Sequence, residues 1–175
     1  QLVGKIPASS YFFHTTVDSN NVQILSCIPE KLEQQLRERF SELSFYHGSC
    51  SFLAYLFKER FNLIGQEIWI NLFGSHIYLA GFTDQELSVF NRFEIETKED
   101  ILKYTLILME SLRQDRNHAR VTLFGSTEKS GTTEEWCKSY FANFRLLQPH
   151  ANQNYGYGLS QDKAPTIFES FWHYA

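Results

Sequence analysis

The 175-residue sequence lacks the marks of several large functional classes. It contains no apolar run long enough to span a membrane and no signal-peptide pattern, so we expect a cytoplasmic protein that does not insert into a membrane. Lysine and arginine total 16 against 20 acidic residues, and the net charge of −4 provides no basic surface for nucleic acid. We therefore expect neither nucleic acid nor a lipid surface as a partner.

Cysteine and clustered histidine are scarce as well. Cys27, Cys50 and Cys137 are odd in number and widely spaced, which is typical of reduced thiols in a cytosolic protein. The six histidines include no i, i+4 pair and have no partner at metal-ligand spacing, so no metal site is expected. Cys50 has no identifiable base beside it, and a small buried thiol is the simpler interpretation. The sequence predicts no catalytic set of nucleophile, base and orienting group.

Apolar and aromatic residues, in contrast, are abundant. They make up 43% and 16% of the chain, with sixteen Phe and nine Tyr. The aromatic residues recur at strand and helix periods rather than in basic runs, which indicates packing in a core. A chain of this length can fold as one generous domain or as two small ones.

The chain is organised around residues 66–126, where the pattern predicts three strands, a helix and a further strand. Residues 66–73 are apolar on both faces, which is typical of a central strand. The Gly-Ser pair at 74–75 predicts a type II′ turn into an antiparallel strand at 76–82. Residues 86–95 alternate between an apolar and a largely polar face, so this third strand of the meander is expected near an edge.

A capped helix is predicted after the meander. Thr97 followed by Asp100 resembles a capping box, and apolar residues at helical spacing continue as far as Arg113. The next strand is predicted at 120–124. Because a helical crossover returns the chain to the same end of the sheet, we expect this strand to run parallel to residues 66–73.

The preceding segment predicts a hairpin, a helix, a short strand and a second helix. Two β-rich runs at 10–17 and 22–28 form the hairpin. The first helix begins at Pro29, the short strand covers 43–47, and the second helix covers 51–61. The first helix carries an apolar stripe made of Leu32, Leu36, Phe40 and Leu43.

The following segment predicts a helix that starts at Thr132-Thr133 and a last parallel strand at 143–147. Residues 148–165 are polar and glycine-rich, which indicates a loop. A short aromatic helical turn is expected at the end, from Phe168, Phe171 and Trp172. We divide the chain into residues 1–64, 65–148 and 149–175.

The order of three-strand meander, helix, strand, helix, strand is that of the ribonuclease-H-like unit used twice in actin-like ATPases. The chain more closely resembles an uncharacterised bacterial family, a domain of unknown function with an actin-like ATPase fold. The resemblance covers most of residues 11–147. It is carried by the segments YFFH at 11–14, IPEK at 28–31, LAGF at 79–82, FNRF at 90–93 and TKEDILKY at 97–104.

This resemblance implies an α/β fold with helices on both faces of the sheet, preceded by part of a first actin-like half. Residues 1–64 would be the remnant of that first half, 65–148 the ribonuclease-H-like second half, and 149–175 an irregular tail. A missing front portion would account for an opening hairpin that is marginal alone. The family is itself similar in architecture to actin-like proteins of type IV pilus and type II secretion assembly.

The resemblance also implies where a nucleotide would bind. In an actin-like ATPase the first hairpin carries an Asp-x-Gly pattern, since the Asp holds a magnesium-bound water and the Gly admits phosphate to the backbone. Here Asn71 replaces the Asp, Phe73 stands in the place of the Gly, and Gly74 comes one residue late. The adenosine loop is represented by Gly125-Ser126, which an ordinary turn after a strand would also explain. The loop that begins there does not match a Walker phosphate loop.

We therefore expect a noncatalytic actin-like protein that acts as a binding or assembly component, with no cofactor, beside a protein partner or as a homodimer. The alternative is a nucleotide-binding protein or ATPase that holds ATP and Mg²⁺. Its cofactor-binding residues would be Asn71, Gly74, Ser75, Gly125 and Ser126. A third alternative is a small-ligand pocket in the tail around Tyr155 and Tyr157.

Overall fold

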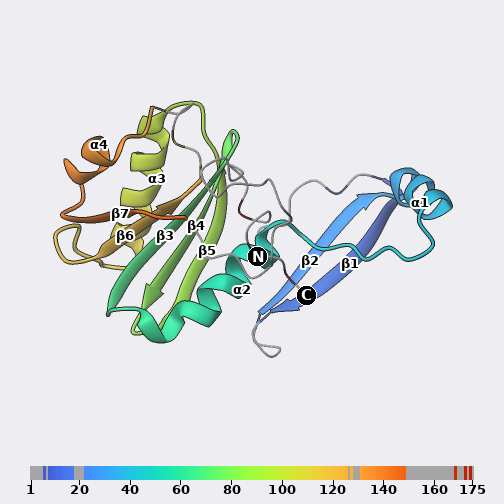
Figure 1. Cartoon of the computed structure of the whole chain (residues 1–175), viewed down its shortest axis with the longest axis horizontal. Coiled ribbons are helices and arrows are strands. Elements are labelled where there is room, and N and C mark those ends of the chain that lie inside the picture. Colours follow the sequence, from blue (N-terminus) through green and yellow to red (C-terminus); the bar gives the residue numbers. More distant parts are fainter. Residues whose placement is uncertain are drawn as a thin grey trace, which may run out of the picture.

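The computed structural model describes residues 6, 8–17, 22–125, 127, 131–148, 168, 172 and 174. These residues form a two-stranded sheet, β1-β2, and a five-stranded sheet with the strand order β5-β4-β3-β6-β7. Figure 1 shows the β1-β2 pair beside the larger sheet, with α2 between the two and α1 at the far end of the pair.

The meander is confirmed at the centre of the larger sheet. Strands β3 (Gln66–Phe73), β4 (His76–Thr83) and β5 (Glu86–Glu94) pair antiparallel in sequence order. Strand β3 is flanked by β4 and β6 and β5 lies at one edge, as the burial pattern of the sequence predicts. The β3–β4 turn has a positive φ of 57° at Gly74 and none at Ser75, the sign pattern of a type II′ turn.

The parallel part of the sheet is confirmed too. Helix α3 (Lys98–Ser111) carries the chain to β6 (Arg120–Phe124), which pairs parallel to β3. A short helix, α4 (Glu134–Lys138), then leads to β7 (Asn143–Leu146), which pairs parallel to β6. All three connected strands therefore end at the same edge of the sheet.

Helices cover both faces of the sheet, and each face has its own core. The α3 face, which packs against α3 and α4, buries mainly aliphatic residues: Ile68, Ile70, Leu72, Ile77, Leu79, Ile101, Leu108, Val121 and Leu123. The α2 face, which packs against α2 (Ser49–Glu59), buries mainly aromatic residues: Phe52, Tyr55, Trp69, Tyr78, Phe82 and Phe124. A 3₁₀ turn, Arg60–Asn62, links α2 to β3.

The expected side-chain pattern of strand β5 was partly wrong. The sequence predicts one continuous apolar face, but the register shifts between Gly81 and Phe82 of its partner strand. This bulge turns Leu87 to the α2 face with Phe90, whereas Val89 packs on the α3 face. An extra residue in one strand reverses the side-chain alternation beyond it, so both faces of β5 are partly apolar.

Two further expectations, both for the β1-β2 region and the segment after it, were wrong. Strands β1 (Ser10–Val17) and β2 (Val22–Pro29) pair as predicted, and α1 (Glu30–Arg39) follows. The apolar stripe of α1, however, is not buried, because Leu32 and Phe40 are 43% and 53% exposed. Arg37 pairs with Glu33 within α1, and it contacts the hairpin by donating from Nη2 to the Tyr11 hydroxyl at 3.3 Å.

Residues 43–47 do not form the predicted strand. Phe45 packs on the face of the hairpin, 5.8 Å from the Tyr11 ring and 5.7 Å from the Phe13 ring. A segment that lies on the face of a hairpin, rather than along its edge, has no strand with which to pair.

The end of the chain also contributes to the α2 face. Phe168 and Trp172 are buried there, and the Trp172 backbone N–H donates to the Phe168 carbonyl at 3.1 Å, as expected for a helical turn. Phe171, residues 149–165 of the loop predicted at 148–165, and the candidate pocket of Tyr155 and Tyr157 lie outside the described residues. No helix in the described ranges is both long and apolar enough to cross a membrane.

Candidate functional site

The candidate site lies at the carboxyl ends of β3 and β6. Parallel pairing places Asn71 beside Phe124, so Gly125 follows directly where β3 runs into the Gly74-Ser75 turn. Four of the five sequence-predicted residues are thus brought to one end of the sheet. Ser126 lies outside the described residues.

Asn71 is buried in the α2 face with only 1% of its surface exposed. Its neighbours across the strands are Tyr78 and Phe124. Neither Oδ1 nor Nδ2 of Asn71 has a hydrogen-bond partner within the described part of the chain. A neutral amide enclosed by aromatic strands offers no charge to a hydrated magnesium ion and leaves no open path to one.

Gly74 is glycine for conformational reasons. Its φ of +57° is in the left-handed region, and a Cβ added there would have no heavy atom within 4 Å. The neighbouring Ser75 Oγ lies 3.2 Å from His76 Nδ1. The turn type therefore accounts for the Gly-Ser pair without a ligand.

Gly125 is glycine for two reasons that the structure makes plain. Its φ is +112°, and a Cβ on it would lie 2.3 Å from the Leu72 carbonyl oxygen. No side chain fits where the chain after β6 comes this close to the backbone of β3. The close approach of the two strands accounts for a glycine at position 125 without a ligand.

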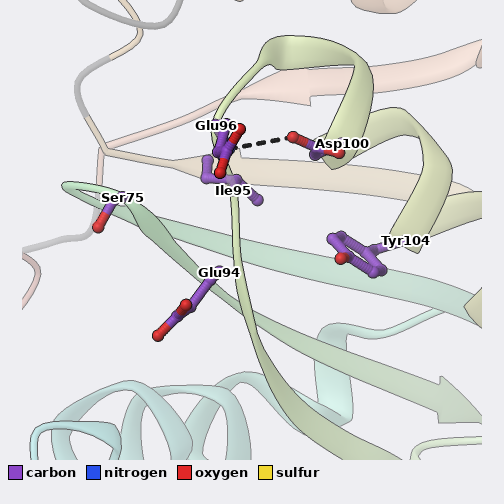
Figure 2. Close-up of a pocket in the computed structure, with 6 residues that line it drawn as sticks. All are labelled: Ser75, Glu94, Ile95, Glu96, Asp100 and Tyr104. Atoms are coloured by element: carbon purple, nitrogen blue, oxygen red, sulfur yellow. Dashed lines mark hydrogen bonds between the residues drawn. The ribbon is translucent and has the colours of Figure 1, made fainter.

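A cavity of about 430 Å³ opens at the same end of the sheet, next to Ser75. Figure 2 shows Ser75 on the turn between β3 and β4 and the other lining residues at the end of β5 and in the first part of α3. Three of them carry carboxylates, and the full set is Ser75, Glu94, Ile95, Glu96, Asp100 and Tyr104. The lining contains no lysine or arginine, so a phosphate group placed here would meet three carboxylates and no cation.

Asp100 has a defined role in this lining. Its Oδ2 accepts hydrogen bonds from the backbone N–H groups of Glu96 and Thr97, both at 3.0 Å, as the predicted capping box requires. These bonds favour the ionised form and lower the pKa of Asp100 below its usual value. Figure 2 shows Asp100 directed toward Glu96, while Glu94 lies apart from that pair. Asp100 is thus a capping residue at α3.

A serine–histidine pair at the start of α2 was not predicted. His47 Nδ1 lies 2.6 Å from Ser49 Oγ and accepts a hydrogen bond from the Ser49 backbone N–H at 3.2 Å. Burial, and then the charge of Arg92, lower the pKa of His47. Ser49 is only 1% exposed, so no substrate reaches its hydroxyl. The adjacent Cys50 is also buried, which raises the pKa of its thiol.

A buried ion pair at the opposite end of the sheet was missed from the sequence. Glu67 is fully buried and pairs with Arg120, its neighbour in the β3–β6 register. Arg145 of β7 donates to Thr122 Oγ1 at 3.3 Å on the same face. A carboxylate inside an otherwise apolar strand was the available signal, because a buried charge requires a partner. No group of three or more potential metal ligands occurs among the residues described.

Comparisons with known proteins agree with this fold. The family described as "Protein of unknown function (DUF3822)" matches residues 1–144. A solved structure from Bacteroides thetaiotaomicron, described as a protein with actin-like ATPase fold and unknown function, is similar with a TM-score of 0.73 and 19% sequence identity. The match covers 82% of this chain and 56% of that chain, little more than half of its length. No curated protein matches. The likeness shows an actin-like ATPase fold.

Proposed function

The chain belongs to the family described as "Protein of unknown function (DUF3822)", and from this premise we propose a noncatalytic actin-like protein that acts as a binding or assembly component. The observation that carries the proposal is the state of Asn71. It stands where the resemblance places a magnesium-organising aspartate, yet it is uncharged and 1% exposed. The fold is kept while the ligand that its chemistry needs is absent from this position.

The charges at the site support the same proposal. Productive binding of a nucleoside triphosphate requires cations or backbone N–H groups around the phosphates. The cavity beside the Gly74-Ser75 turn is instead lined by Glu94, Glu96 and Asp100. These carboxylates repel a polyphosphate, and Asp100 stays ionised because its pKa is lowered by backbone hydrogen bonds.

The β1-β2 region supports the binding role. Its outward face exposes Phe12 and Leu25, which are 49% and 70% exposed, and the pair belongs to no larger sheet among the described residues. Apolar side chains beside strand edges are suited to contact with another protein chain or a second copy of this one. We propose residues 1–64 as the remnant of a first actin-like half, and a role related to actin-like proteins of pilus assembly.

We further propose a bacterial cytoplasmic protein. The three cysteines are free, and two of them are buried, which is consistent with a reducing compartment. The solved neighbour from Bacteroides thetaiotaomicron supports a bacterial setting.

Isothermal titration with ATP and ADP, each with and without Mg²⁺, tests the proposal. The expected result is no heat of binding up to millimolar nucleotide. The variant Asn71→Asp serves as a matched control, since it restores the missing carboxylate at the same position. Magnesium-dependent binding by the wild-type chain at micromolar affinity would overturn the noncatalytic proposal.

The alternative, a nucleotide-binding protein or ATPase, has one observation in its favour. The space around Gly74 is open, and the sheet brings Gly74, Ser75 and Gly125 to the same end, where a ligand could approach the backbone. Magnesium would then need acidic ligands from another part of the protein or from a partner. Hydrolysis assays with Mg²⁺ and ATP distinguish this alternative, because the noncatalytic proposal predicts a background rate.

A further inference from the structure

A polar cluster lies on the α2 face, away from the Gly74 turn. Parallel register places Glu67 beside Arg120, and it places Trp69, Thr122 and Arg145 in the next row across β3, β6 and β7. These side chains therefore belong to neighbouring positions of one sheet face. The cluster includes two guanidinium groups in a region that is otherwise aromatic.

Several donors in this cluster are unused. Nε of Arg120, Nε of Arg145 and Nε1 of Trp69 are buried donors that have no hydrogen-bond partner among the described residues, and Glu67 Oε2 is a buried acceptor that has none either. Arg145 donates from Nη2 to Thr122 Oγ1 at 3.3 Å, a long bond to a neutral acceptor. Buried donors without acceptors are rare because each one costs free energy, and three in adjacent positions require an explanation.

The charge of the cluster is also unbalanced. Glu67 Oε1 already accepts from Arg120 and from the Ile64 backbone N–H, which lies 2.9 Å away. Arg145 has no carboxylate of its own in the described part of the chain. Burial and the charge of Arg120 lower the pKa of Arg145, against smaller opposing effects of Glu67 and Tyr55. One guanidinium is thus half-buried with no matching anion.

We propose that Arg145, with Arg120 beside it, binds an oxyanion, either the carboxylate or the phosphate group of a small ligand, on the α2 face of β6 and β7. A guanidinium presents Nε and Nη as a planar fork that fits two oxygens of such a group. Strand β7 is the last strand of the sheet, so the ligand reaches Arg145 from the sheet edge. Binding satisfies the unused Nε donors and balances the second positive charge.

This site is separate from the Gly74 and Gly125 region. Glu67 and Arg120 lie at the amino ends of β3 and β6, whereas the two glycines follow the carboxyl ends of the same strands. The inference therefore does not depend on whether nucleotide binds at the glycines.

Thermal unfolding and NMR of the full chain test it. Inorganic phosphate and succinate are the two probes, and sodium chloride at equal ionic strength is the control. We expect one probe to raise the melting temperature saturably and to shift the Arg145 Nε–H resonance. Arg145→Gln should weaken the apparent affinity at least tenfold, while Arg116→Gln, which removes an exposed arginine, should leave it unchanged.

The probes also distinguish the two kinds of oxyanion. Saturation by phosphate indicates a phosphate group, and saturation by succinate indicates a carboxylate. An equal response to both probes and to chloride would overturn the proposal. So would an Arg145 Nε–H resonance that is already protected without ligand and insensitive to both probes, since Arg145 would then pair with Glu67 Oε2. The resonance is read in the wild-type protein, so the test does not depend on the folding of any variant.

Discussion

At the carboxyl end of the five-stranded sheet carboxylates line an open cavity, whereas at the amino end a carboxylate is paired with a guanidinium inside the sheet. The carboxyl end has an acidic cavity lined by Ser75, Glu94 and Asp100. The cavity lies next to the β3–β4 turn, whose backbone conformation explains Gly74. The amino end places the fully buried Glu67 against Arg120 inside the sheet. Actin-like ATPases bind nucleotide at the carboxyl end of such sheets, and the noncatalytic proposal holds that this chemistry is lost here.

The difference separates two uses of polar residues. At the carboxyl end the carboxylate of Asp100 caps a helix and faces water, which contributes modestly to stability. At the amino end a charge removed from water depends entirely on its partner. Removal of a charged side chain should therefore destabilise the protein more at the amino end than at the carboxyl end.

The largest effect is expected at the amino end. Glu67→Gln removes the carboxylate that pairs with Arg120 and lies near Arg145, and should lower the free energy of unfolding by about 4 kcal/mol. Urea denaturation followed by tryptophan fluorescence measures the change. Glu86→Gln, at an exposed position of β5, is the matched control and should change it by less than about 0.5 kcal/mol. A loss below about 1 kcal/mol for Glu67→Gln would remove the contrast between the ends.

Gly125→Ala should produce the next largest loss, and at the carboxyl end. The added Cβ meets the Leu72 carbonyl oxygen at 2.3 Å and sits at a φ of +112°, so we expect about 3 kcal/mol of destabilisation. Gly131→Ala provides the comparison, because its φ is +64° but the space around it is open. That variant should lose only about 1 kcal/mol. Equal losses in the two variants would mean that the close approach of β6 to β3 contributes nothing.

A smaller loss is expected from the helix cap. Thr97→Ala removes the N-cap of α3 and the 3.1 Å hydrogen bond from its hydroxyl to Asp100 Oδ2, which should cost about 1 kcal/mol. Thr97→Ser keeps the hydroxyl and should retain most of the stability. Guanidinium denaturation of both variants measures the difference. If serine and alanine are equally destabilising, the hydroxyl does not cap the helix.

The two turns of the meander lie at opposite ends of the sheet, and a glycine substitution in each turn can be compared directly. Asp84 and Gln85 both have positive φ values, 49° and 69°, although neither is glycine. Gln85→Gly should relieve this strain and raise the free energy of unfolding by about 0.5 kcal/mol. Ser75→Gly, where φ is not positive, should instead lower it by about 0.5 kcal/mol. Changes of the same sign in both turns would contradict the assignment.

The pH dependence of stability tests the role of Asp100. A carboxyl group whose pKa is lower in the folded state contributes stability above its unfolded pKa of about 4, and this contribution is lost as the pH falls through the folded pKa. The wild-type protein should therefore lose stability below about pH 4, and Asp100→Asn should show a shallower decline there. Thermal melts across this range give the slope. Parallel curves for the two proteins would show that Asp100 gains nothing from its backbone hydrogen bonds.

The sequence was sufficient for the features that follow from local periodicity. The apolar faces of residues 66–73, the Gly-Ser turn and the length of the crossover at α3 predicted the meander and the parallel strand. It was insufficient where register decides. The bulge opposite Gly81 and the pairing of Glu67 with Arg120 depend on which residues of distant strands face each other.

The candidate site shows the same limit. The sequence places Gly125 directly after a strand. A turn, a nucleotide loop and a close approach of two backbones all favour glycine at such a position. Only the position of the Leu72 carbonyl shows that the close approach of the backbones is the reason here. Similarly, the spacing of Leu32 and Phe40 predicts an apolar stripe but not whether anything covers it, and the structure leaves both exposed.

The most direct test of the central claim is an NMR titration of the wild-type chain with Mg²⁺ and ATP. The backbone amide resonances of Gly74, Ser75 and Gly125 report on the carboxyl end of the sheet, where an actin-like ATPase would hold its nucleotide. A degraded nucleotide site predicts that these three resonances do not move up to millimolar ATP. Saturable, magnesium-dependent shifts of all three would contradict that claim and make the protein a nucleotide-binding member of the fold.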